Sequence, residues 1–299
     1  MPLAAFPKCF VEALADEREM RVEQWIEMGD QFDVDGFEFF TGFAPLEAHR
    51  TWESYAKLVA KKGRSIPMLC HSSDFTHPDA AYRREQIARQ KAAIDVAAIL
   101  GARYCRILTG QRRPEVSRQD GIKWVKECIL DCVEYAATRG VVLNIENHYK
   151  DHTWLYPEFA QKREVFVEVL SELPRSEWLG VNYDPSNCII AGEDPIEMLL
   201  AVKDRVVTMH ASDRFFKDGN FEDLQKLEAD PVAGYASILQ HGVIGRGMND
   251  YDRIFSILKE AGFHGWVSIE DGPDPATGAE DIRESALFLR KKMSEYRLP

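Results

Sequence analysis

Two hydrophobic patterns alternate along the chain from one end to the other. Short runs of apolar and β-branched residues predict strands, and the longer segments between them carry apolar residues at helical spacing. Together they indicate eight strand-and-helix units. The predicted strands are Cys9–Ala13, Gly36–Phe40, Ile66–His71, Ala102–Leu108, Val141–Glu146, Leu179–Asp184, Val206–His210 and Trp266–Glu270.

Two of the predicted helices have clear signals at their ends. In Ser117–Arg139, Ser117 and Asp120 have the spacing of a capping box, and apolar residues recur along one face. The segment Tyr251–Ala261 is stopped by Gly262. Apolar stripes of this kind are typical of helices that pack on a core, so we interpret both helices as scaffold.

The repeated units predict the α/β class and a single (β/α)8 TIM barrel that forms one domain over residues 1–299. A glycine-rich phosphate loop does not follow the first predicted strand, which argues against an open nucleotide-binding sheet. Residues 211–249 form a connection far longer than the ~2–6 residues usual for such loops. We expect this loop to be a lid or a surface for subunit contacts.

Composition and charge exclude several classes of protein. The 299 residues are 45% hydrophobic and 29% charged, as in ordinary globular proteins, and the apolar runs are too short for a membrane span. A net charge of −12 repels phosphate backbones, so we expect no nucleic-acid partner and no membrane partner. The N-terminal residues lack a signal-peptide pattern, and the six cysteines lack disulfide-framework spacing, so we expect a cytoplasmic protein.

Four consecutive predicted strands, the fifth to the eighth, end in the same way. Each ends in a small polar residue, then an apolar residue, then a possible metal ligand. Because strand side chains alternate, the first and third residues of each tripeptide point into the barrel, at the end where barrels hold their functional residues. The tripeptides are Asn144-Ile145-Glu146, Asn182-Tyr183-Asp184, Thr208-Met209-His210 and Ser268-Ile269-Glu270.

The four strand ends predict a metal site. An acid at one strand end is more often a capping or salt-bridged residue, but four such groups at one level bring three carboxylates together. A divalent cation removes their repulsion, so we expect Glu146, Asp184, His210 and Glu270 to bind one metal ion. Three oxygen ligands and one imidazole suit Mn²⁺, our first choice, as well as Co²⁺, Mg²⁺ or Zn²⁺.

These residues resemble the xylose-isomerase-like TIM barrel superfamily of sugar isomerases and epimerases, over essentially the whole chain. The resemblance implies that the four residues above bind one divalent metal. In the ketose 3-epimerases of the superfamily the two glutamates also exchange the proton, and the arginine that matches Arg214 contacts substrate. The motifs that carry the resemblance are Asn144-Ile145-Glu146-Asn147, Tyr183-Asp184-Pro185-Ser186-Asn187, His210-Ala211-Ser212-Asp213-Arg214, Gly245-Arg246-Gly247 and Ser268-Ile269-Glu270.

One position departs from the epimerase pattern. Those enzymes usually carry a histidine three residues after the sixth-strand aspartate, where this chain has Asn187, which we keep as a candidate substrate contact. Endonuclease IV, another member of the superfamily, needs several further histidines that are missing here. The acidic composition also argues against DNA repair.

Other residues are candidates for catalysis or substrate binding. His148 shares the phase of Glu146 and is either a catalytic base or a loop histidine bonded to the backbone. His71 ends the third strand and contacts either a sugar hydroxyl or the protein itself. Arg246, in the long loop, is a further candidate substrate contact. Glu38 and Arg106 are weaker candidates, because such residues commonly occur at strand ends.

Three functions fit these features. The first is a divalent-metal-dependent isomerase or epimerase that removes a proton next to the carbonyl of a keto-sugar. The second is a lyase on 3-keto-glycosides, like the catalytic subunits of C-glycoside deglycosidases, and His148 and Asn187 favour it. The third is a sugar-binding barrel without catalysis. We expect a homo-oligomer, joined under the lyase hypothesis by a small β-rich partner subunit.

Overall fold

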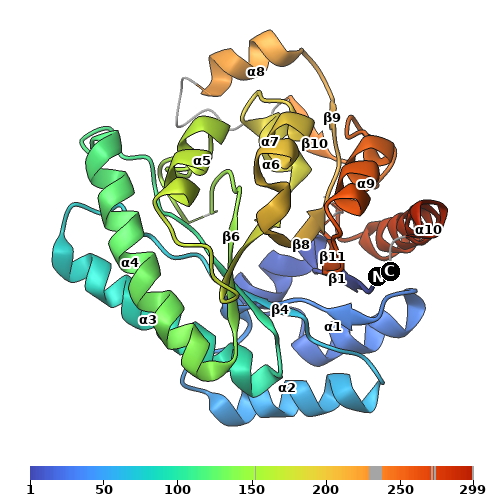
Figure 1. Cartoon of the computed structure of the whole chain (residues 1–299). Helices are drawn as coiled ribbons and strands as arrows, with labels where there is room; N and C mark the ends of the chain where they lie inside the picture. Colours follow the sequence, from blue (N-terminus) through green and yellow to red (C-terminus); the bar gives the residue numbers. More distant parts are fainter. Residues whose placement is uncertain (152, 229–237, 271, 273, 298–299) are drawn as a thin grey trace.

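The computed structural model describes residues 1–151, 153–228, 238–270, 272 and 274–297. A parallel sheet forms the centre of the molecule and helices surround it (Figure 1). The strands of this sheet are β1 Leu3–Ala5, β2 Gly36–Phe37, β3 Phe39–Phe40, β4 Met68–Cys70, β5 Tyr104–Ile107, β6 Val142–Glu146, β7 Leu179–Tyr183, β8 Val206–Ala211 and β11 Trp266–Ile269.

The sheet closes through the second predicted strand. Its order is β2-β1-β11-β8-β7-β6-β5-β4-β3, so β2 and β3 lie at its two ends. Only Glu38 separates them in the chain, β2 pairs with β1, and β3 pairs with β4. The sheet therefore returns on itself, and the predicted TIM barrel fold is confirmed.

Helices follow most strands and cover the outside of the barrel. For α4, Ser117 Oγ accepts a hydrogen bond from the backbone N–H of Asp120 at 3.0 Å, and Gly140 ends the helix with φ of 68°, as the sequence predicts. The helices are α1 Val22–Met28, α2 His49–Lys61, α3 Ala80–Leu100, α4 Arg118–Arg139, α5 Arg163–Ser171, α6 Pro185–Ile190, α7 Pro195–Val202, α8 Phe221–Glu228, α9 Tyr251–Glu260 and α10 Gly278–Tyr296. None of these described helices has the length and apolar character to cross a bilayer.

The interior of the barrel holds polar side chains, whereas the apolar core lies between strands and helices. Asn144 donates a hydrogen bond to Thr208 Oγ1, and Thr208 donates one to Asn182 Oδ1 at 2.8 Å. Asn144 and Thr208 reach each other across β7, which is possible only on the concave side of the sheet. The small polar residues of the strand-end tripeptides thus form a layer below the strand ends, while Ile145 and Met209 are buried on the other side.

The first predicted strand, Cys9–Ala13, is wrong. Lys8–Phe10 forms a 3-10 helix and Glu12–Asp16 a π-helical turn, and the first strand is Leu3–Ala5. The side chains of Leu3–Ala5 are fully buried, and this strand pairs with β11 on one side and with β2 on the other. The apolar residues that suggested a strand bury one side of the two short helices instead.

The long connection at 211–249 contains secondary structure of its own. After β8, the strand β9 Arg214–Phe216 pairs antiparallel with β10 Leu239–His241, and α8 lies between them in the chain. In Figure 1, α8 lies at the top edge of the molecule. Residues 229–237 of this connection lie outside the described residues.

Candidate metal centre

The carboxyl ends of four neighbouring strands bring four possible metal ligands together. Glu146 ends β6, Asp184 follows β7, His210 lies in β8 and Glu270 follows β11. One ligand atom of each lies within 4.8 Å of the others, and none of the four residues is more than 6% exposed. The structure therefore places all four residues predicted as ligands in one buried cluster.

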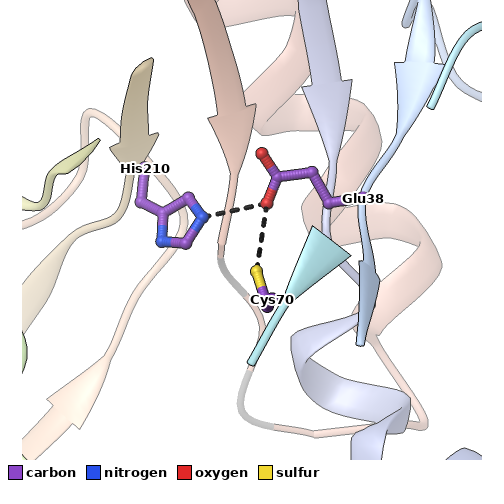
Figure 2. Close-up of side chains that lie close together, drawn as sticks. All are labelled: Glu38, Cys70 and His210. Carbon is purple, nitrogen blue, oxygen red and sulfur yellow. Dashed lines mark hydrogen bonds and ion pairs between the residues drawn. The ribbon is translucent and has the colours of Figure 1, made fainter. Parts of the chain in front are cut away.

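The two ring nitrogens of His210 face different acids. Nδ1 lies 3.2 Å from Glu146 Oε1 and 2.7 Å from Glu270 Oε2, on the side of the ligand cluster. Nε2 lies 2.9 Å from Oε2 of Glu38, and the Cys70 thiol contacts the same oxygen at 3.8 Å, as Figure 2 shows. A proton on Nε2 donated to Glu38 leaves the Nδ1 lone pair directed at the cluster, the tautomer a metal ligand needs.

The cluster fits a divalent cation. Glu270 Oε2 is buried and makes no hydrogen bond with the described residues, although it lies 2.7 Å from His210 Nδ1. Burial, followed by the charges of Glu270 and Glu146, raises the pKa of Asp184 to about 6. Three buried carboxylates with one imidazole are a donor set for Mn²⁺, Co²⁺, Mg²⁺ or Zn²⁺. A bound cation would remove the repulsion between the carboxylates, which contributes to the raised pKa of Asp184.

Two cationic side chains from the first half of the barrel touch the cluster. Arg106 Nη1 lies 2.8 Å from Glu146 Oε2, and Lys8 Nζ lies 2.9 Å from Glu270 Oε1. Burial alone raises the pKa of Glu146, but the charges of His210 and Arg106 outweigh it and lower that pKa to about 2. Burial is likewise outweighed at Glu270, where Lys8 and His210 lower the pKa well below its usual range. Both glutamates are therefore carboxylates at neutral pH.

Hydrogen bonds from neutral groups hold Asp184. Its Oδ1 accepts from Ser212 Oγ at 2.6 Å and from the backbone N–H groups of Ser186 and Asn187, at the N-terminus of α6. The Asn147 side chain accepts from the Asp184 N–H at 2.9 Å, which fixes the backbone there. The candidate Asn187 also donates through Nδ2 to Glu146 Oε1 at 3.2 Å, so it joins two of the four ligands.

A cavity of about 210 Å³ adjoins the cluster. Glu270, Arg106, Lys8 and His148 are among its lining residues. His148 is buried, and its Nδ1 lies 3.3 Å from Glu158 Oε2. The structure thus places His148 and Glu270, both proposed catalytic residues, on the wall of one cavity.

The remaining candidates lie in three different places. His71 is buried, and its Nδ1 lies 3.1 Å from Thr41 Oγ1 in a second cavity that borders the first. Arg214 is buried, with Nη2 2.9 Å from His241 Nε2, and its guanidinium lies 5.8 Å from the ring centroid of Tyr149, which lines the smaller cavity. The Arg246 side chain is 67% exposed and pairs with Glu284 of α10 at 2.8 Å, so the structure does not bring it to the cluster.

Sequence reasoning missed Lys8 and gave too little weight to Glu38. Lys8 follows the true first strand, and the misplaced strand at Cys9–Ala13 hid that position. Glu38 is a charged residue between two phenylalanines in a strand that is buried on both faces. An acid in such a place needs a partner inside the protein, and this signal was present in the sequence.

Comparisons with known proteins agree with the fold. A model of the xylose isomerase-like TIM barrel family matches residues 27–292. A solved structure of the IolI protein with a bound zinc atom is 19% identical, with a TM-score of 0.75 over 99% of each chain. The D-psicose 3-epimerase of Clostridium cellulolyticum H10, solved with D-tagatose, is 12% identical, with a TM-score of 0.74 over 98% of this chain and 99% of that one. These likenesses concern the fold.

Curated relatives match a part of the chain. The inosose dehydratase of Geobacillus kaustophilus (strain HTA426) is 26% identical over 171 residues, which are 56% of this chain and 52% of the relative. The inosose dehydratase of Lacticaseibacillus casei is 28% identical over 113 residues, which are 37% of this chain and 36% of the relative. The match therefore spans about half of the first relative and about a third of the second.

Proposed function

The chain belongs to the xylose isomerase-like TIM barrel family, and from this premise we propose that it is a divalent-metal-dependent isomerase or epimerase of keto-sugars. The observation that carries the proposal is the buried cluster of Glu146, Asp184, His210 and Glu270 beside a cavity. We take Mn²⁺ as the metal. When bound, the cation supplies positive charge to a carbonyl oxygen and the neighbouring hydroxyl oxygen of the sugar.

Glu270 is the residue best placed to remove the proton. Its Oε1 is held by Lys8 at 2.9 Å, its Oε2 faces His210 Nδ1 at 2.7 Å, and the residue lines the cavity. An ionised carboxylate held at the wall of the cavity can take the C–H proton next to the carbonyl. The electron pair of that bond moves toward the carbonyl and gives an enediolate.

Glu146 is the second proton-transfer group. Both of its oxygens have partners, because Arg106 contacts Oε2 while Asn187 and His210 contact Oε1. These contacts hold the carboxylate in one orientation within the cluster. Return of a proton to the same carbon gives an epimer, and return to the neighbouring carbon gives an aldose or ketose isomer.

A lyase is the second candidate, and His148 favours it. This histidine lines the same cavity as Glu270 and has Glu158 behind it at 3.3 Å, so it can carry a proton to a leaving group. The same enediolate then loses a neighbouring substituent instead of regaining a proton. The curated relatives are named inosose dehydratases, a name that also denotes an elimination.

The test measures proton exchange in D₂O. The purified protein, after metal analysis and loading with Mn²⁺, is incubated with a panel of ketoses and keto-glycosides, and NMR follows C–H exchange and leaving-group release separately. We expect exchange next to the carbonyl with at least one substrate. Exchange without release identifies the isomerase, whereas release in step with exchange identifies the lyase.

The Glu270→Gln variant tests the assigned base. We expect a fall in the exchange rate of about 10³-fold or more with the same far-UV circular dichroism, since an amide cannot accept the proton. Glu260→Gln, at an exposed position on the last turn of α9, is the matched control. Full exchange activity in Glu270→Gln would overturn the role of this residue.

A further inference from the structure

A second cavity, of about 710 Å³, borders the smaller cavity at the metal centre. We call it the α3 groove, and it lies between residues 40–49, which follow β3, and one face of α3. Phe40 and Asp151 line both cavities. Arg106 links the two as well, because it contacts Glu146 at the cluster and donates to the carbonyl oxygen of His71 in the groove. The groove therefore directly borders the candidate active site.

The lining of the α3 groove combines apolar side chains with an excess of acidic ones. Phe40, Pro45 and Leu46 contribute apolar surface from one side, and Ala88 and Ala92 leave open space on the α3 side. Its charged lining residues are four carboxylates and one guanidinium, on Glu47, Glu85, Asp95, Asp151 and Arg89. This excess of negative charge disfavours a phosphate or another anion.

His71 provides a specific contact inside the groove. It is 8% exposed, its Nδ1 is occupied by Thr41, and its Nε2 has no hydrogen-bond partner among the described residues. A buried nitrogen without a hydrogen-bond partner costs free energy, so a ligand that forms this hydrogen bond binds more tightly. Burial and the nearby Arg106 charge lower the pKa of His71 to about 4, so the ring is neutral at pH 7. A hydroxyl can donate to or accept from a neutral imidazole in either tautomer.

We propose that the α3 groove binds an uncharged second ring attached to the keto-sugar, so that the preferred substrate is a keto-glycoside. This inference rests on the proposed function, since it places the reacting sugar in the smaller cavity. A volume of about 210 Å³ leaves little room beyond one sugar, whereas about 710 Å³ lies within the ~300–1,000 Å³ of ordinary ligand sites. The groove thus selects against both free sugars and sugar phosphates.

Binding is tested first with probes that cannot react. Calorimetry of the Mn²⁺-loaded protein compares phenyl β-D-glucoside, glucose and glucose 6-phosphate. We expect the phenyl glucoside to bind at least ten-fold more tightly than either of the others. Equal affinity for glucose and phenyl glucoside, or tighter binding of glucose 6-phosphate, would overturn the inference.

Ala88→Trp fills the groove from the exposed side of α3, where a large side chain does not disturb the core. We expect it to weaken phenyl glucoside binding at least ten-fold and to leave glucose binding unchanged. Ala98→Trp, also exposed on α3 but outside both cavities, is the matched control and should bind as the wild type does. Unchanged phenyl glucoside binding in Ala88→Trp would rule the groove out as the site.

Proton exchange with 3-keto-glucose and phenyl 3-keto-glucoside separates this inference from the proposed function. Loss of glucoside binding in Ala88→Trp, with no exchange in the wild type, supports the groove and rejects the enzyme assignment. Exchange of both ketones at wild-type rates in Ala88→Trp supports the enzyme and rejects the groove.

Discussion

The two halves of the barrel contribute to the metal centre in different ways. The half that contains β6, β7, β8 and β11 supplies all four candidate ligands, each at or next to the carboxyl end of its strand. The half that contains β1 to β5 supplies single residues that contact those ligands: Lys8, Glu38 and Arg106. The comparison separates the residues that would bind a metal from the charged residues that contact them.

The charged contacts from the first half have an electrostatic consequence, which a comparison of the pKa values of Glu146 and Asp184 shows. Arg106 from the first half contacts Glu146, and its charge, after that of His210, lowers the pKa of this carboxyl to about 2. Asp184 has only neutral donors, and burial with two neighbouring carboxylates raises its pKa to about 6. Charged contacts from the first half, together with His210, thus stabilise Glu146 and Glu270 as anions before a cation is bound.

Glu38→Gln tests whether the first half controls metal binding. The amide can still accept from His210 Nε2 but carries no charge, so it polarises the imidazole less and does not fix one orientation. Loss of such a partner typically costs ~10–100-fold in metal affinity. We therefore expect Mn²⁺ binding, measured by competition with a chelator, to weaken by a factor in that range.

The matched control for this variant is Glu53→Gln, on the exposed face of α2. It should bind Mn²⁺ as the wild type does. If Glu38→Gln folds normally and keeps full metal affinity, the contact between Glu38 and His210 Nε2 has no influence on metal binding at Nδ1. The two halves then act independently.

The sequence predicts the ligand half of the site well because that half is a repeat. The same three-residue pattern at four strand ends needs only the alternation of strand side chains to place Glu146 and Glu270 on one surface. The supporting half has no repeat. Lys8 contacts Glu270, which lies 262 positions later in the chain, and this contact depends on the pairing of β1 with β11.

Local pattern also fails where a tertiary contact decides the structure. Leu3–Ala5 is too short to stand out as a strand, yet it joins the barrel because neighbours on both sides complete its hydrogen bonds. The α3 groove is not visible in the sequence, since its walls come from segments that meet only in the folded protein.

His71 gives a prediction about pH that concerns the first half alone. Its pKa is about 4 in the folded protein against 6.5 ordinarily, so between these values the unfolded chain binds a proton that the folded protein does not. Stability is thus present above pH 6.5 and is lost as the pH falls toward 4. The contribution between pH 7 and pH 5 is about 2 kcal/mol.

Urea unfolding of the wild type and His71→Asn at pH 7 and pH 5 measures this contribution. We expect the variant to lose less stability than the wild type on acidification, by about 2 kcal/mol. His264→Asn, at an exposed histidine, should retain the wild-type difference. Equal pH dependence in all three proteins would mean that His71 titrates normally and is not held neutral by burial.

The smallest effect is expected at Arg246, which lies in the ligand half of the chain but away from its cluster. The side chain is 67% exposed and pairs with Glu284, a surface contact of the kind that contributes ~0–1 kcal/mol. We expect Arg246→Ala to change kcat/KM for proton exchange less than about 2-fold, because nothing in the cluster loses a partner. A ten-fold rise in KM with unchanged kcat would show instead that the connection after β8 folds over the substrate. Charged supporting residues would then come from both halves of the barrel, and the division between them would fail.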